Sequence, residues 1–372
     1  MCDDELIIME FLESDVETNF DYRQKRRDIR IQSNPFELDD SAFIKKYRLS
    51  KELVLNLCEE LRPYLKIPKK TTDLSIETKL LTALSFYATG SYQRATGDIS
   101  GHSMAQQTVS AVITEITACL NRTEIRKKYI HFPKNLEERN KIRSRFHQQF
   151  KIPGVLGCIG GTHIAIIRPT DNEETYYSRK QYHSLNVQLI CDADMNITSV
   201  EASYGGATQD SFIWNLHPIK LHMDNLNECT WLLGDSGYPL GKYMMTPIIN
   251  ATPGSPAYHY TNLHVQTRNS IERTIGLLKS RFRCLLVHRV LHYKPKMAAS
   301  IVIACVILHN ICNRANMPVP ELSNEDVLRE AQMQPNASRV DSGAATSSNN
   351  QALQQGVATR DALIRRLSDA SD

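Results

Sequence analysis

The spacing of apolar residues changes near the middle of the chain. Before about residue 125, apolar residues recur every three or four positions, as in Leu53, Leu57 and Leu61, which predicts amphipathic helices. From Gly154 onward, runs rich in β-branched residues predict at least four strands: GVLGCIGGTHIAIIRP, LNVQLICD, ITSVEASYG and TWLLGD. Helical patterns lie between and after them: SFIWNLHPIKLHM, residues 268–286 and MAASIVIACVILHNICNRAN. We therefore expect an all-helical domain followed by an α/β domain with a mixed sheet flanked by helices.

The two ends of the chain show little sustained apolar periodicity. The start is acidic and is followed by a basic cluster at 23–30, and residues 335–359 are of low complexity, a composition that buries too little apolar surface to order itself. A short basic helix, DALIRRL, is expected near the end. The predicted parts are a loosely ordered leader (1–35), a helical domain (36–125), a basic connector (126–153), the α/β domain (154–318) and a mostly disordered tail (319–372).

Within the helical domain, residues 91–117 predict a helix, a glycine-containing turn and a second helix that begins near Ser103 or Gln106. This is the spacing of a helix-turn-helix, whose second helix enters the major groove of DNA. An ordinary helical hairpin is the commoner structure with the same pattern. In the first case these side chains would face the groove: Gln106, Gln107, Thr108 and Ser110.

Composition excludes several classes of protein. The chain has 372 residues, of which 41% are hydrophobic and 23% charged, which suits about two globular domains. No stretch approaches the roughly 18 to 20 consecutive apolar residues of a membrane span, and the start is acidic where a signal peptide is basic, so we expect no membrane partner. Nine cysteines without a CxxC pair predict reduced, mostly buried thiols. Cys305, His309 and Cys312 share one apolar helix and are expected in the core rather than at a metal.

The charge is unevenly distributed along the chain. Although the net charge is only +3, residues 122–151 contain ten Lys/Arg against three Glu, and residues 268–296 contain eight Lys/Arg against one Glu. One such run is most simply a solvated helix face. Two runs flanking one domain favour a polyanion as partner.

Three acidic residues are candidates for chemistry on that partner. Cleavage of phosphodiesters by two divalent ions needs carboxylates that hold both ions. Asp235 directly follows the strand WLLG, and Glu272 is the only acid in a strongly basic helix. Asp210 lies at the start of a helix, where a role as N-cap is, for this residue taken alone, the better explanation. Glu272 has a simpler explanation too, an ion pair with Arg268 or Arg273.

Six blocks in a fixed order, spread over about 154–315, resemble the catalytic domain of PIF/Harbinger transposases and of the nucleases derived from them: GCIGGTHIAI, RKQYHSLNVQLICD, GGATQDSFIW, LLGDSGYP, RNSIERTIGLLKSRFRCL and CVILHNIC. The resemblance implies an RNase H-like fold with a DDE triad that uses Mg²⁺ or Mn²⁺. By the same resemblance, Asp235 and Glu272 are the second and third triad residues, catalytic and metal-binding, and Asp210 is a further acid that assists the metal.

The first triad position differs from the family pattern. The family has CIDGTH where this chain has CIGGTH, so Gly160 occupies the position of the first aspartate. Changes to groups that bond to metal ligands typically lower metal affinity or activity 10- to 100-fold, and losing a ligand itself should lower them further. We therefore expect metal-dependent DNA cleavage to be impaired, with weak manganese-dependent nicking. The alternative is a catalytically inactive nuclear factor that binds DNA and protein.

Nearby residues offer little replacement for the missing carboxylate. His163 lies three residues from Gly160, so the alternation of a strand places it on the opposite face. The acids of the following loop would reach the site only if that loop folded over it: Asp171, Glu173 and Glu174.

Several basic residues are candidates for phosphate contacts, which give salt-dependent affinity and little sequence information. A solvated helix face explains each of them equally well. The resemblance also implies a Myb/SANT-like DNA-binding partner and a location in the nucleus, with the cytoplasm as the alternative, and the cluster at 23–30 has the composition of a nuclear localisation signal. The candidate contacts are Arg179, Lys180, Lys279, Arg281 and Arg283.

Overall fold

The computed structural model describes residues 24–68, 73–90, 102–333 and 350–369. Contacts within the chain divide it into two units, Met1–Cys119 and Leu120–Asp372. The division falls close to the boundary expected at 125.

The first unit is helical throughout the part described. Ser50 and Ser75 begin two of its helices, where each side-chain oxygen accepts a hydrogen bond from the backbone N–H three residues later. Gly90 ends one of them in the left-handed conformation, φ 64°, as glycine does at helix ends. The cap at Ser75 and the end at Gly90 are as the sequence predicts. The helices are α2 (Asp40–Tyr47), α3 (Lys51–Leu61), α4 (Ile76–Thr89) and α6 (Gln106–Leu120), with short 3₁₀ turns η1 (Pro35–Glu37) and η2 (Arg62–Tyr64).

The helix-turn-helix stays a prediction. Residues 91–101, which would supply its first helix and part of its turn, lie outside the described residues. Helix α6 begins at Gln106, with Gln106 and Gln107 exposed and Val109 buried. This arrangement suits a groove-facing helix and a simple hairpin alike.

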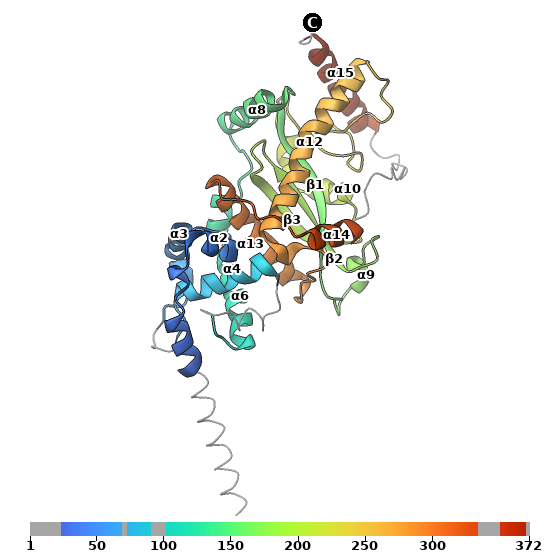
Figure 1. The fold of residues 1–372 in the computed structure, drawn as a ribbon. Coiled ribbons are helices and arrows are strands. Elements are labelled where there is room, and N and C mark those ends of the chain that lie inside the picture. Colours follow the sequence, from blue (N-terminus) through green and yellow to red (C-terminus); the bar gives the residue numbers. More distant parts are fainter. Residues whose placement is uncertain (1–23, 69–72, 91–101, 334–349, 370–372) are drawn as a thin grey trace, which may run out of the picture. The chain divides into compact units, whose positions relative to one another are not determined.

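The second unit is built on a five-stranded mixed sheet (Figure 1) with the strand order β3-β2-β1-β4-β5. Strand β1 pairs antiparallel with β2 and parallel with β4. The α/β class with a mixed sheet is thus confirmed, and the sequence pattern missed only the two-residue β5. The strands are β1 (Val155–Ala165), β2 (Ser184–Cys191), β3 (Ile197–Gly205), β4 (Trp231–Leu233) and β5 (Met244–Met245).

Helices cover both faces of this sheet. Successive residues of β1 point to opposite faces, so the strand contributes apolar contacts to the helices on each side. On one face, Ile159 joins an apolar cluster with Trp214 and Met223. On the other face, Ile271 of a long helix lies over Gly160. That helix, α12, crosses the sheet in Figure 1. The helices of this layer structure are α8 (Leu136–Phe150), α10 (Asp210–Leu216), α11 (Pro218–Asp224), α12 (Pro256–Arg281) and α13 (Pro295–Arg314).

Helix α13 is the one helix of the described chain that is long and apolar enough to cross a membrane, by length and composition alone, and 67% of its most apolar window is buried inside the fold. It packs against β3 and α12. Asn310 holds the edge of the sheet, since its side chain accepts from Ile197 N and donates to Ile197 O. His309 is fully buried and bonds to Met195 O. The predicted core role of this helix is confirmed.

The cysteines agree with the prediction of reduced, mostly buried thiols. All eight within the described residues are free, and all but Cys229 are buried.

Three of the predicted segments, the leader, the connector and the tail, contain more helix than expected. Part of the leader, residues 24–32, is helical. The expected basic connector forms α7 (Thr123–Tyr129) and α8, and α8 packs against β1. The tail, expected to be mostly disordered with a short helix DALIRRL near its end, contains α14 (Asn324–Met333) and α15 (Asn350–Asp369). The expected short helix is part of α15, and contacts with residues far away in the sequence order the longer helix. Leu363 and Leu367 of α15 are buried, and α15 packs against α12 and β5.

Candidate active site

Gly160 and Asp235 both lie just beyond the last paired residues of two neighbouring strands. Strands β1 and β4 run parallel, with Cys158 opposite Leu233. Gly160 comes two residues after Cys158 in β1, and Asp235 comes two residues after Leu233, in the loop that follows β4. The position where the family carries its first aspartate is therefore near the end of the strand that leads to the second.

Asp235 and Glu272 are brought together by an arginine. Nη2 of Arg268 donates to Asp235 Oδ2 at 3.0 Å and to Glu272 Oε1 at 2.9 Å. Arg268 precedes Glu272 by one turn of α12, and its side chain is 19% exposed. The second oxygen of Asp235 accepts from Gly237 N at 2.9 Å. The sequence offered two interpretations of Glu272: a triad residue near Asp235, or a simple ion pair with Arg268. The structure contains both arrangements, because Arg268 bonds to Glu272 and to Asp235.

Asp210 lies on the other side of β1. The N-cap of α10 is Gln209, so Asp210 is the first helical residue and the expectation of an N-cap is wrong. Its Oδ1 accepts from Asn186 Nδ2 at 2.8 Å, and a Cβ added at Gly161 would stand 2.8 Å from the same oxygen. Because Gly161 and Gly160 face opposite ways, the carboxylate of Asp210 does not fill the position missing at Gly160.

The environment of Asp210 disfavours its charge. Burial is the largest cause and raises the pKa of this carboxyl, the hydrogen bond from Asn186 lowers it, and the negative charge of Asp235 raises it again. Tyr238, which the sequence argument did not single out, is buried close by and accepts from Gln188 Nε2 at 3.1 Å. Burial raises the pKa of Tyr238, and the charges of Asp210 and Asp235 add to the effect. The block GDSGYP was the one sequence signal for this tyrosine.

Gly160 allows close packing of α12 on β1. A Cβ added there would lie 3.1 Å from Cγ1 of Ile271, so any side chain requires that isoleucine to move by a few tenths of an ångström. The possible replacements lie elsewhere, as expected: His163 bonds through Nδ1 to Ser184 Oγ at 2.9 Å. Glu173 bonds to Arg168 and His183.

The residues present do not fit a two-ion centre. Two divalent ions about 3.5 to 4 Å apart need several carboxylates directed at them. Among the residues that the structure describes, no group of three or more His, Cys, Asp or Glu is arranged to hold a metal ion. Asp235 and Glu272 share a guanidinium instead, and Asp210 stands on the opposite face of β1 from the missing ligand.

The structure corrects two of the five basic candidates. Lys279 and Arg281 are 4% and 3% exposed, so neither reaches a DNA phosphate in this conformation. Lys279 Nζ bonds to Glu330 Oε1 of α14 at 2.6 Å. Arg281 Nη1 bonds to His309 Nδ1 at 3.2 Å. Both lie on the covered side of α12, which a count of basic residues does not reveal.

The other three basic candidates differ in exposure. The side chain of Arg283 is 26% exposed, and its Nη1 lies 3.6 Å from Oδ2 of Asp326 in α14. Its Nη2 donates to Glu321 O, before that helix begins, at 3.0 Å. Lys180 is half-buried, and burial lowers its pKa. Arg179 is exposed. Arg179 and Lys180 are therefore the candidates best placed to meet a polyanion.

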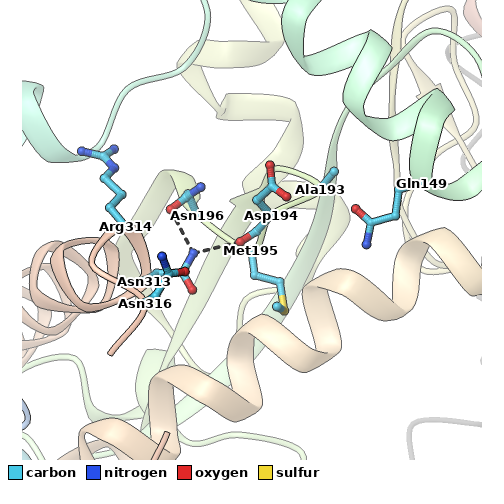
Figure 2. A pocket seen from close by; sticks show the side chains of 8 residues that line it. All are labelled: Gln149, Ala193, Asp194, Met195, Asn196, Asn313, Arg314 and Asn316. Carbon is cyan, nitrogen blue, oxygen red and sulfur yellow. Dashed lines mark hydrogen bonds between the residues drawn. The ribbon is translucent and has the colours of Figure 1, made fainter. Parts of the chain in front are cut away.

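A polar pocket of about 390 Å³ opens at the turn between β2 and β3 (Figure 2). Asn313 Nδ2 closes one side by donating to Asp194 O at 2.8 Å and to Asn196 Oδ1 at 3.0 Å. No residue predicted for the site lines it. The lining residues are Gln149, Ala193, Asp194, Met195, Asn196, Asn313, Arg314 and Asn316.

Comparison with known proteins agrees with the resemblance drawn from the sequence. Residues 159–310 match the family described as DDE superfamily endonuclease. The protein named "Putative nuclease HARBI1" of Bos taurus is 33% identical over 291 residues, which cover 76% of this chain and 82% of that protein. Its Homo sapiens counterpart is 32% identical over the same coverage. "Protein ALP1-like" of Arabidopsis thaliana is 22% identical over 296 residues, 73% of this chain and 71% of that protein.

No solved structure matches the chain. The family match nevertheless spans the strand with Gly160, both acids bridged by Arg268 and most of α13. Together with the identity over most of the chain, it shows that this protein belongs to the Harbinger transposase-derived family of DDE superfamily endonucleases.

Proposed function

We propose that this chain is a DNA-binding protein of the DDE nuclease family whose metal-dependent cleavage of phosphodiester bonds is impaired. One observation carries the proposal: Gly160 of β1 follows Cys158, which pairs with Leu233 at the end of β4, and Asp235 follows that same strand end. The site therefore lacks a carboxylate where the family has its first catalytic acid. Asp235 and Glu272 are the catalytic residues of this proposal, and Asp210 is the acid that assists.

Family membership supports DNA as the substrate and a divalent cation, Mg²⁺ or Mn²⁺, as the cofactor, because DDE endonucleases generally use divalent metals. The ion would supply charge stabilisation at the phosphodiester. Asp235 and Glu272 would hold it, but only weakly, because both already bond to Arg268. We expect cleavage to be limited to slow nicking in Mn²⁺, and the fold to be RNase H-like.

The exposed Arg179 and the half-buried Lys180 support contact with the DNA backbone, since such residues neutralise phosphates and release counterions. A Myb/SANT-like partner protein and a nuclear location, with the cytoplasm as the alternative, are part of the proposal by resemblance to the family. Affinity for DNA should then fall steeply with salt.

A second candidate function is a catalytically inactive nuclear factor that binds DNA and protein. The bridge from Arg268 to Asp235 and Glu272 favours it, because a guanidinium between the two acids already offsets part of their negative charge.

Nicking of supercoiled plasmid in Mg²⁺ and in Mn²⁺ separates the two functions. We expect the native chain to nick slowly in Mn²⁺, Glu272→Ala to be inactive, and Gly160→Asp to cleave much faster. The matched control is Gly160→Asn, which presses on Ile271 to the same extent without adding a charge.

Each outcome has a distinct meaning. Slow nicking that is lost in Glu272→Ala and enhanced only in Gly160→Asp supports impaired catalysis. A silent native chain that Gly160→Asp activates supports the inactive factor. Rapid cleavage by the native chain would contradict both and would mean that another group replaces the missing aspartate.

A further inference from the structure

Arg268 occupies the space between the two acids of the site. One nitrogen, Nη2, lies 3.0 Å from Asp235 Oδ2 and 2.9 Å from Glu272 Oε1. A contact between Arg268 and Glu272 is ordinary for residues four apart on a helix. The contact with Asp235 is not, because Asp235 comes from the end of β4 in the sheet, so the arginine joins two separate elements.

The position of Arg268 is set by the packing of α12. Its neighbours Thr267 and Ile271 are fully buried, and Thr267 O accepts from Cys158 Sγ of β1 at 3.3 Å. These contacts fix the rotation of the helix about its axis. The side chain of Arg268 itself is 19% exposed, against 56% for Glu272, so the guanidinium lies on the inner side of the pair.

The arrangement supplies to two carboxylates what a metal ion supplies elsewhere, a cation that both of them contact. It is also permanent, because an arginine side chain stays protonated in proteins. A divalent ion placed at the same oxygens would meet a fixed positive charge within a few ångströms, where like charges repel strongly. The missing carboxylate at Gly160 would have offset part of that repulsion.

We infer that Arg268 takes the place of the metal in this site, as an internal cation that joins β4 to α12 through Asp235 and Glu272 and weakens the binding of divalent ions to them. Arg268 is then a positioning residue for both acids. The inference rests on the proposed impairment of cleavage but is tested by ion binding and stability, so the two can fail separately. If Gly160→Asp restores no cleavage, the proposed function fails and this inference is untouched.

The test is a titration of Mn²⁺ into the full chain, followed by electron paramagnetic resonance of the free ion. The variants are Arg268→Gln, which removes the charge but keeps a polar side chain, and Arg268→Lys, which keeps the charge. The matched control is Arg273→Gln, an exposed arginine on the same helix next to Glu272. Asp235→Asn in the Arg268→Gln background identifies ions bound at this site rather than elsewhere.

We expect Arg268→Gln to bind Mn²⁺ about ten- to a hundredfold more tightly than the native chain, the range found when a group bonded to metal ligands is changed. Arg268→Lys and Arg273→Gln should bind as the native chain does. The gain should disappear in the double variant with Asp235→Asn. Equal binding by the glutamine and lysine variants would overturn the inference, because charge would then not be the cause.

Thermal unfolding supplies an independent readout. The Tm of the native chain should differ little between EDTA and Mn²⁺. Arg268→Gln should melt lower in EDTA and recover as Mn²⁺ is added, since a ligand that binds only the folded state stabilises it by mass action. If Arg268→Gln does not fold at all, the native chain decides: Mn²⁺ binding tight enough to raise its Tm, and abolished by Asp235→Asn, would overturn the inference, and an unchanged Tm would support it.

Discussion

At the scale of single residues, Asp210 shows how burial and function conflict in this site. Burial raises the pKa of its carboxyl, although Asn186 donates to it. A raised pKa means that the folded chain binds this proton more readily than the unfolded chain does. The ionised carboxylate therefore lowers the free energy of unfolding at neutral pH. This penalty disappears as the pH falls from the raised pKa to the ordinary pKa of an aspartate.

We therefore expect Asp210→Asn to raise the free energy of unfolding at pH 7 and to leave it nearly unchanged near pH 3. The asparagine keeps an oxygen that accepts from Asn186 while removing the buried charge. Urea denaturation of the two chains at both pH values measures the difference. A less stable variant at pH 7 would show instead that the negative charge is held by its basic neighbours, Lys180 and Arg268.

At the scale of elements, α14 explains why Lys279, a basic residue of α12, does not reach solvent. Glu330 of α14 bonds to the buried Lys279 at 2.6 Å and accepts from Val287 N at 2.9 Å. Glu330→Gln should cost about 3 kcal/mol of stability, because it leaves a buried ammonium without its carboxylate. Glu325→Gln on the same helix removes an exposed pair with Arg329 and should cost only about 0.5 kcal/mol. Denaturant titration compares them, and equal costs would contradict the burial of the pair.

The C-terminal helix α15 depends on one close approach. A Cβ added at Gly356 would stand 2.8 Å from Cα of Gly241, in the loop that follows Asp235. We expect Gly356→Leu to displace α15 from this loop and to speed hydrogen exchange of the α15 amides by at least about tenfold, since contacts rather than local propensity hold the helix. The exposed Gln354 provides the control, because Gln354→Leu should leave exchange unchanged. Slow exchange in Gly356→Leu would contradict the argument.

At the scale of the whole molecule, buried histidines set the response to acid. Burial lowers the pKa of His163, His264 and His309 to about 4 and that of His102 to about 3. Because the unfolded chain takes up these protons near pH 6.5, stability is complete above that pH and is lost as the pH falls from about 6.5 toward 4.

Urea unfolding between pH 7.5 and 4.5 should show a loss of a few kcal/mol, with each histidine contributing at most about 3 kcal/mol. The loss should be larger in the second unit, because three of these four histidines lie there and only His102 lies in the first. A flat profile between pH 7 and 5 would mean that the histidines are accessible to protons in the folded state.

Local patterns along the chain were enough for most elements. The β-branched runs located β1 to β4 because each strand carries its own apolar residues, and the serine at 75 and the glycine at 90 marked the ends of α4. The same reasoning found only the last part of α15, the segment DALIRRL, and expected residues 350–359 to be disordered. The order of the whole helix comes from contacts with α12 and β5, and no window of sequence contains those partners.

For the site, the sequence by itself determined which side chains exist: a glycine where the family has an acid, two remaining triad acids, and an arginine one turn before Glu272. Only the tertiary structure decided what these groups contact. The sheet and α12 together place Asp235 on the guanidinium of Arg268, and the packing of α14 covers Lys279. Burial and charge pairing depend on which elements fold against each other, and residue types along the chain do not specify that.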